Sequence, residues 1–281
     1  MEVRLHGTVD DFRDVAVPIY RRDPVSATVE LMVLSDRMVD RNPAPLLATV
    51  WNGASAVGAA FQTLRSPLLC AGVPEPVVGT VVTELAERCP DLNGVHGPVG
   101  TTTAFAEGWC ALTGSFATVR NNERLHRLDA LLPPTSVAGS PRHADAADQN
   151  LINLWFNGFR AEALGLPVDA DVDRRNVRTA KGPPDEIVLW TLDGMPVSMA
   201  GVRSPVADVS RIGPVYTPPD RRGQGYGAAV TAAATQWALS RGATDVVLFT
   251  DVTKPAVNAV YQRIGFRPVT DFLRIDFGRP R

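Results

Sequence analysis

The sequence predicts a two-domain α/β protein in which one order of helices and strands is used twice. Its length of 281 residues suits two domains better than one. A hydrophobic content of 45% and a charged content of 21% are typical of a globular chain with a sizeable core. Two hairpin turns, Asn52-Gly53 and Asp193-Gly194, lie 141 residues apart at equivalent places in the two halves.

The N-terminal half alternates apolar runs with turn residues. Apolar residues at helical spacing predict a helix over 25–40, and two apolar runs joined by Asn52-Gly53 predict a hairpin. The other elements expected here are a strand, SPLLCA, helices over 77–88 and 103–112, and a strand over 115–120.

Residues 133–145, PPTSVAGSPRHAD, are rich in proline and small residues, which predicts a linker. We therefore expect domains at 1–134 and 145–281, joined by a linker at 135–144. Beyond the linker the same order begins again. The expected elements are a helix, DQNLINLWFNGFRAEAL, a hairpin turning at Asp193-Gly194, a strand, SRIGPVYT, a helix over 222–240, a strand, DVVLFT, a helix over 256–264 and a strand, FLRIDF.

Composition argues against several classes of protein. A formal net charge of −2 disfavours nucleic acid as the main partner. The three cysteines form no CxxC pair, so we expect neither a disulfide framework nor a zinc site. We expect the protein to lie in the reducing cytoplasm. The histidines lack ligand-spaced partners, which predicts no metal site and favours structural or solvent roles. No stretch predicts a signal peptide or a membrane span.

The stretch TPPDRRGQGYGAAVTAAA, residues 217–234, predicts an anion site. It joins a predicted strand to an alanine-rich helix through a turn with three alternating glycines. The first N–H groups of a helix have no internal acceptors, and the helix dipole adds partial positive charge there. Bare glycines and two arginines at this point favour a pyrophosphate over a single carboxylate.

Two nucleotide-binding motifs are possible interpretations of this stretch. GQGYGA satisfies the dinucleotide spacing G-x-G-x-x-A, and Asp251 follows the next predicted strand as a ribose-binding acid would. However, the glycines follow PPDRR and not the strand itself, and fewer than 60 residues remain after Gly223. A dinucleotide-binding oxidoreductase is therefore disfavoured. A Walker A loop is excluded because no Gly-Lys-Ser/Thr follows.

The same stretch resembles the GNAT superfamily of acetyl-CoA-dependent N-acyltransferases. Arg222-Gly223-Gln224-Gly225-Tyr226-Gly227 resembles the family's R/Q-x-x-G-x-G/A signature. Downstream, Asn258-Ala-Val-Tyr261 and Gly265-Phe266 resemble its N-x-x-x-Y...GF segment, although Lys254 stands where many relatives have asparagine. The resemblance covers about residues 145–277.

The resemblance implies two tandem GNAT-like domains, each a mixed, mostly antiparallel sheet flanked by helices. It implies acetyl-CoA as the acyl donor and coenzyme A as the co-product. The residues expected to bind the cofactor are Val215, Tyr216, Thr217, Arg222, Gly223, Gln224, Gly225, Tyr226, Gly227, Ala228 and Asn258. Asparagine is also common as a helix cap, which is the alternative for Asn258.

Acyl transfer to an amine needs an acid for the departing thiolate and a way to keep the amine neutral. Tyr261 is the expected general acid, because a phenol of ordinary pKa about 10 can donate to a thiolate. Ordinary packing is its alternative. Asp208 and Glu186 are candidates for the general base, with a water chain as the alternative.

The N-terminal half is expected to repeat the architecture without the chemistry. After SPLLCA it reads GVPEPVVGTVV, with one acid, no base and no glycine triplet. We therefore expect a degenerate partner domain and an N-acetyltransferase whose active site lies in the C-terminal half. The acceptor is a small-molecule or peptide amine of unknown identity. A non-catalytic acetyl-CoA sensor is the alternative, and the oligomeric state is open, with a homodimer among the options.

Overall fold

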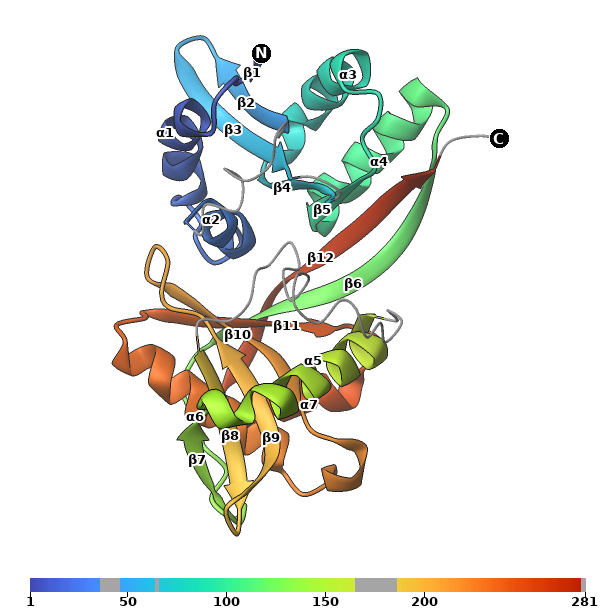
Figure 1. Ribbon diagram of the computed structural model, residues 1–281. Helices are drawn as coiled ribbons and strands as arrows, with labels where there is room; N and C mark the ends of the chain where they lie inside the picture. The colour runs from blue at the N-terminus through green and yellow to red at the C-terminus, as the bar shows by residue number, and fades with distance from the viewer. Residues whose placement is uncertain (36–45, 64–65, 165–185, 279–281) are drawn as a thin grey trace. The chain divides into compact units, whose positions relative to one another are not determined.

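The computed structural model describes residues 1–35, 46–63, 66–164 and 186–278 (Figure 1). The chain forms two compact units. Unit 1 comprises Met1–Leu125, Asp251–Thr253 and Val269–Arg281, and unit 2 comprises His126–Thr250 and Lys254–Pro268. Each is a mixed α/β unit, as the sequence predicts.

Unit 1 is built on a sheet whose strands lie in the order β1-β2-β3-β4-β5-β12. Neighbouring strands are antiparallel except β4 and β5, which are parallel. Its elements are β1 (Glu2–Leu5), α1 (Val9–Tyr20), α2 (Thr28–Ser35), β2 (Leu46–Asn52), β3 (Ser55–Gln62), β4 (Leu68–Gly72), α3 (Val78–Arg88), β5 (Gly94–Pro98), α4 (Val99–Thr113), most of β6 (Phe116–Leu128) and most of β12 (Phe266–Gly278).

Helices cover both faces of the unit 1 sheet. On one face α3 and α4 pack against the strands, with Leu85 and Trp109 in the same buried cluster as Val95. On the other face α1 packs Phe12 edge-on against Phe61 of β3. The sheet is therefore buried on both sides, which explains the continuous apolar runs of β2 and β4.

Unit 2 repeats this plan, with strands in the order β11-β10-β9-β8-β7. Only β10 and β11 are parallel in this series. Its elements are β7 (Ser140–His143), α5 (Gln149–Leu164), β8 (Glu186–Leu192), β9 (Met195–Val202), β10 (Val209–Tyr216), a 3-10 turn (Pro219–Arg221), α6 (Tyr226–Ser240), β11 (Asp245–Asp251), α7 (Pro255–Arg263) and the ends of β6 and β12.

Two helices of unit 2 pack on opposite faces of its sheet (Figure 1). Val188 and Val202 belong to the buried cluster that includes α6. On the same two strands, Leu189 and Met199 face the other way and pack against Trp155 of α5. This alternation follows from the period of two along a strand. It places α5 on one side of β10 and α6 on the other.

Both predicted hairpins and the mixed, mostly antiparallel sheets are confirmed. The division of the chain differs from the prediction. The first segment of unit 1 ends at Leu125 and not at residue 134. The unit also includes most of β12, because β12 pairs with β5 from Phe272↔Pro98 to Asp276↔Gly94. Pairing partners so distant in sequence leave no local signal.

Other boundaries also differ. The predicted linker contains β7, which pairs with β8. The strand β5 was missed, because GVHGP carries proline and two glycines, and β1 and α1 were not foreseen. The helix expected over 25–40 is described only as α2, and residues 36–45 and the loop at 166–185 lie outside the described residues. Within the described residues, no helix is long and apolar enough to cross a membrane.

Candidate active site

The strand β10 separates from its parallel neighbour β11 halfway along its length. The two pair from Val209↔Asp245 to Arg211↔Val247, although β11 continues to Asp251. On its other edge β10 keeps its pairing with β9 up to Tyr216, with an irregularity between Ile212 and Val215. A bulge of this kind bends a strand. The backbone of β10 beyond Arg211 therefore presents an edge toward β11 that can pair with an extended ligand.

The glycine stretch follows this edge after the 3-10 turn Pro219–Arg221. Gly223 and Gly225 have φ of +78° and +84°, a conformation that glycine adopts without strain. The helix α6 therefore begins at Tyr226, four residues later than predicted. Ala229 donates the first backbone bond of α6, to the carbonyl of Gly225 at 3.0 Å. The N–H groups of residues 226–228 precede that bond and are available to an anion.

Small residues keep this helix start accessible. A Cβ on Gly225 would approach Val137 to 2.9 Å, whereas one on Gly223 would meet no atom within 4 Å. Gly227 sits beside Thr217, whose hydroxyl would lie 3.4 Å from an added Cβ. Inside the turn, the buried Tyr226 donates its hydroxyl hydrogen to the Gln224 side chain at 2.9 Å. This hydrogen bond holds the turn from within.

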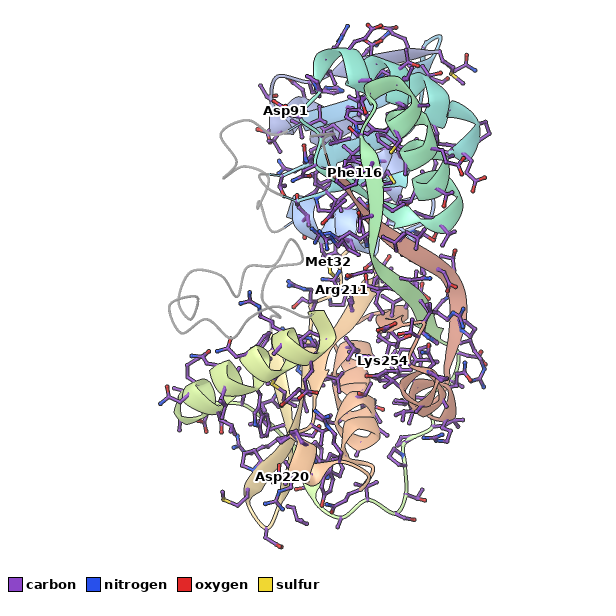
Figure 2. All side chains as sticks on the ribbon, turned by 90° about the vertical axis from the view of Figure 1, so that its right-hand side faces the viewer. Met32, Asp91, Phe116, Arg211, Asp220 and Lys254 are labelled. Atoms are coloured by element: carbon purple, nitrogen blue, oxygen red, sulfur yellow. The ribbon has the colours of Figure 1, made fainter. Side chains whose placement is uncertain are left out.

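Both arginines of the stretch are engaged with carboxylates. Arg222 donates from Nε to the Thr217 carbonyl at 2.9 Å and from Nη2 to Glu162 of α5 at 2.6 Å. Arg221 lies 3.3 Å from Asp220, which Figure 2 labels. These side chains are about half exposed or more, so the pairs are weak and exchangeable. An incoming phosphate can replace the carboxylates.

Tyr216 links β10 to α5. Its ring packs 6.4 Å from that of Trp155, and its hydroxyl donates to Glu162 at 3.3 Å. Burial, followed by the neighbouring Glu162 carboxylate, raises the pKa of Tyr216. Val215, one residue earlier, packs on the opposite, α6 face of the sheet. Consecutive residues of β10 therefore anchor the strand to both helices beside the glycine turn.

Tyr261 lies on α7 and packs on the α6 side of the sheet, against the same buried cluster as Val215. Its ring meets Phe266 edge-on at 6.4 Å. The residue as a whole is only partly buried, but burial of its hydroxyl raises the pKa of Tyr261 to about 12, and a hydrogen bond with Thr231 lowers it in part. The phenol is therefore protonated, and able to donate, at neutral pH.

Asn258 occupies a different environment from the one expected. Its amide oxygen accepts from Thr250 Oγ1 at 2.6 Å and from His126 Nε2 at 3.0 Å, and its Nδ2 donates to the Lys254 carbonyl at 2.9 Å. The alternative as a helix cap is wrong, because Lys254 is the N-cap of α7. The direct bond from Asn258 to the cofactor stays a prediction.

The candidate bases are not brought together with Tyr261 by any contact among the described residues. Asp208 immediately precedes β10, at the end away from the glycine turn, and its carbonyl accepts from the backbone N–H groups of Thr244 and Asp245. Glu186 begins β8, and its carboxylate lies 3.5 Å from His143 of β7. Both roles stay predictions.

The equivalent region of unit 1 is occupied by its own side chains. In the described residues β4 pairs with β5 at Leu68↔Val95 and Leu69↔His96 and no further. Next to them Cys70 donates its thiol hydrogen to the His96 carbonyl at 3.4 Å, and the Ala71 N–H donates to the buried Glu30 carboxylate at 3.1 Å. The loop that follows has prolines at 74 and 76, which offer no N–H.

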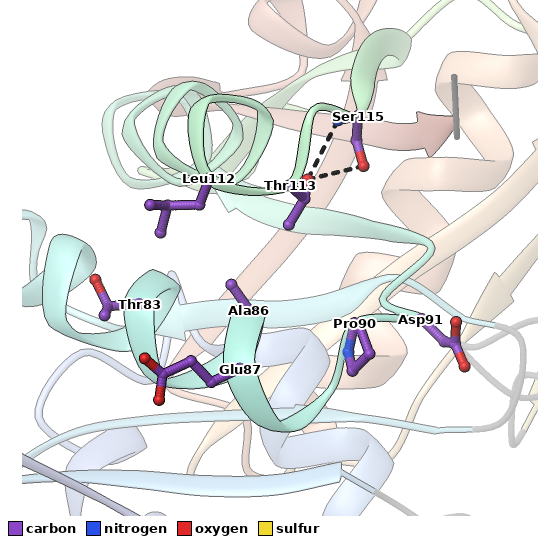
Figure 3. A pocket seen from close by; sticks show the side chains of 8 residues that line it. All are labelled: Thr83, Ala86, Glu87, Pro90, Asp91, Leu112, Thr113 and Ser115. Carbon is purple, nitrogen blue, oxygen red and sulfur yellow. Dashed lines mark hydrogen bonds between the residues drawn. The ribbon is translucent and has the colours of Figure 1, made fainter. Parts of the chain in front are cut away.

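A separate pocket of about 740 Å³ lies between α3 and α4 in unit 1 (Figure 3). Its lining includes Glu87 and Asp91, and the hydroxyl groups of Thr113 and Ser115, which also line it, are hydrogen-bonded at 2.8 Å. No lysine or arginine is among the lining residues, so the pocket is unsuited to a polyphosphate. Among the described residues, no group of three histidines, cysteines or acids is arranged to hold a metal ion.

Comparison with known proteins agrees with this geometry. Residues 150–266 match the model of the acetyltransferase (GNAT) family. A search of curated proteins found no match. Among the strand pairs described from β11 to β7, β10 and β11 alone are parallel, which also argues against the dinucleotide fold, because that fold needs a mostly parallel sheet.

Several solved structures share the fold over nearly the whole chain. A GCN5-related N-acetyltransferase from Sphaerobacter thermophilus has a TM-score of 0.62 at 16% identity, covering 99% of this chain and 96% of its own. One from Kribbella flavida scores 0.58 at 19% identity, covering 90% and 96%. A tandem GNAT protein from the clavulanic acid biosynthesis pathway, solved without AcCoA, scores 0.58 at 14% identity over 100% of both chains.

Proposed function

We propose, on the premise that residues 150–266 match the GNAT acetyltransferase family, that the protein transfers an acetyl or short acyl group from coenzyme A to an amine. The observation that carries the proposal is the free edge of β10, which leads through a 3-10 turn into a glycine turn and a helix start. An extended arm ending in a pyrophosphate matches these two features in that order. Acetyl-CoA has this shape and supplies an activated thioester.

The residues of unit 2 divide the binding task. Backbone groups of Val215, Tyr216 and Thr217 pair with the extended arm. The N–H groups from Gly223 to Ala228 hold the pyrophosphate, because they combine unpaired donors with the positive end of the helix dipole. Arg222 adds charge after exchanging Glu162 for phosphate.

Tyr261 is the proposed proton donor to the leaving thiolate. Its hydroxyl is protonated at neutral pH, and α7 holds it on the face of the sheet that Val215 also contacts. The acceptor amine must be neutral to attack, and Asp208, Glu186 or a water chain removes its proton. The acceptor itself is a small-molecule or peptide amine. The three cysteines are free thiols, which supports a reducing compartment such as the cytoplasm.

The test is an assay of thiol release from acetyl-CoA with a library of amines, with product masses measured in parallel. We expect turnover with at least one amine by the wild type and none by an Arg222→Glu, Gly225→Val double variant. A Glu75→Gln variant, in the equivalent loop of unit 1, is the control and keeps wild-type turnover.

Two outcomes contradict parts of the proposal. Tight acetyl-CoA binding without transfer to any amine would favour the alternative of a sensor or structural ligand site. No acetyl-CoA binding by the wild type would mean that the glycine turn binds a different anion, and the acyltransferase proposal would then fail.

A further inference from the structure

Three buried polar side chains connect the helix of Tyr261 to the sheet of unit 2. His126 comes from β6, Thr250 from β11 and Asn258 from α7. Their residues are only 0%, 5% and 6% exposed. A buried polar group is costly unless it is hydrogen-bonded, so such a cluster strongly specifies how its elements meet.

The direction of each hydrogen bond follows from one contact. Asn258 faces the Lys254 carbonyl at 2.9 Å, and a carbonyl only accepts, so the amide nitrogen must be on that side. The amide oxygen therefore faces Thr250 and His126. Since this oxygen only accepts, the Thr250 hydroxyl donates to it and His126 Nε2 carries a hydrogen. The strands supply both donors to the acceptor on α7, and the Thr250 oxygen also accepts from His126 Nε2 at 3.1 Å.

The position of Asn258 on α7 connects the cluster to Tyr261. The two residues are three apart, so their side chains are neighbours along the helix. The N-cap residue Lys254 makes no side-chain capping bond, and the Asn258 amide ties its carbonyl instead. A shift or rotation of α7 would separate the amide oxygen from its two donors inside the protein, which opposes such a movement.

We infer that His126, Thr250 and Asn258 are positioning residues that hold α7 so that the Tyr261 hydroxyl keeps its place beside Thr231. The inference rests on the proposed function, in which Tyr261 donates to the leaving thiolate. On this inference Asn258 positions α7 within the active site and does not itself bind the cofactor. Loss of the cluster then slows the chemical step and leaves acetyl-CoA affinity intact.

The sharpest variant is Thr250→Val, which removes one donor with little change of shape. Thr235→Val is the matched control. Thr235 is also fully buried in unit 2, but its hydroxyl donates to the Thr231 carbonyl within α6 at 2.8 Å. Thr250→Ser restores the hydroxyl and serves as the rescue.

The readouts are kcat and KM for acetyl-CoA by thiol release, using the best amine of the screen or water as the acceptor, and the Kd of acetyl-CoA by calorimetry. We expect kcat of Thr250→Val to fall about 10- to 100-fold, since small displacements of a reacting group have effects of this size. Its Kd stays at the wild-type value. Thr235→Val keeps both parameters, and Thr250→Ser recovers most of the lost kcat.

Two results would overturn the inference while leaving the proposed function standing. One is an unchanged kcat in Thr250→Val. The other is a weakened Kd for acetyl-CoA in Thr250→Val, which would return the cluster to cofactor binding. If the wild type itself releases no thiol, the proposed function fails, and hydrogen exchange over 254–266 decides the positioning role. Faster exchange in Thr250→Val than in Thr235→Val supports it, and equal exchange refutes it.

Discussion

Unit 1 and unit 2 contain the same hairpin, parallel strand pair and crossover helix but use the end of the parallel pair differently. In unit 1, Cys70 and the buried Glu30 carboxylate bond to the backbone of β5 and β4. In unit 2 the edge of β10 runs into an exposed glycine turn. One fold therefore provides either the proposed ligand site or a region occupied by the protein's own side chains, and a few side chains at that point decide between them.

The largest expected effect is a loss of turnover when the proposed proton donor of unit 2 is removed. Tyr261→Phe removes the proposed donor while keeping the ring contact with Phe266. We predict a fall in kcat of about 100- to 1,000-fold with acetyl-CoA affinity unchanged, because general acid catalysis contributes about this much. Steady-state kinetics with calorimetry on the same preparations checks it. A kcat within about threefold of the wild type would reduce Tyr261 to a packing residue.

The second prediction concerns the region of unit 1 beside β4 and β5 that its own side chains occupy. Glu30→Ala removes a buried carboxylate and leaves the Ala71 N–H without its acceptor. We predict a loss of about 2–4 kcal/mol in the free energy of unfolding, with acetyl-CoA affinity unchanged. Urea denaturation measures it, and Glu87→Ala, an exposed acid of the same unit, is the near-neutral control. Weaker acetyl-CoA binding in Glu30→Ala would break the comparison, because unit 1 would then contribute to the site.

A third, smaller effect concerns how the two units begin their first helices. In unit 1 the neutral Thr8 hydroxyl accepts from the Asp11 N–H. In unit 2 Arg142 donates twice to Asp148, and together with the Asp145 N–H it lowers the pKa of Asp148 to about 2.

Because this pKa is lower in the folded state than the usual value near 4, the stabilisation is present above pH 4 and is lost as the pH falls through about 2. Asp148→Asn should lower the free energy of unfolding at pH 6 by about 1–2 kcal/mol. It should also remove this part of the acid dependence in urea titrations at pH 6 and pH 3. An equal loss at both pH values would contradict the account.

The smallest expected effect is that of the Glu162 side chain on acetyl-CoA affinity. Its carboxylate holds Arg222 at 2.6 Å and adds negative charge beside the proposed pyrophosphate site. Glu162→Gln should tighten acetyl-CoA binding about two- to fivefold, most at low salt, since exposed pairs are weak and screened. Calorimetry at two salt concentrations measures this. Weaker binding would mean that Glu162 prepares Arg222 for the ligand and does not compete for it.

The sequence predicted the parts of the fold that depend on local chemistry. Asn52-Gly53 and Asp193-Gly194 specify tight turns, and both hairpins formed there. The glycine stretch was also located correctly, though α6 starts later because two of its glycines adopt positive φ. Features that depend on distant pairing were missed. The pairing of β12 with β5 moved the domain boundary, and no periodicity within either strand encodes its partner.

The site follows the same rule. The turn from Arg222 to Gly227 was visible as a motif, whereas the partners of Asn258 were not. His126 lies 132 residues away from it, and its burial could be read only from the folded chain. Glu162 was missed for a similar reason, since an exposed acid on an amphipathic helix looks like a solvated surface charge.

The most direct test of the central claim is the stoichiometry and location of acetyl-CoA binding, measured by calorimetry on a matched pair of variants. Gly227 and Gly79 are each the second residue of the helix that follows the parallel strand, α6 in unit 2 and α3 in unit 1. We predict one site per chain, lost in Gly227→Val and unchanged in Gly79→Val. Two sites, or binding that survives Gly227→Val and is lost in Gly79→Val, would contradict the account.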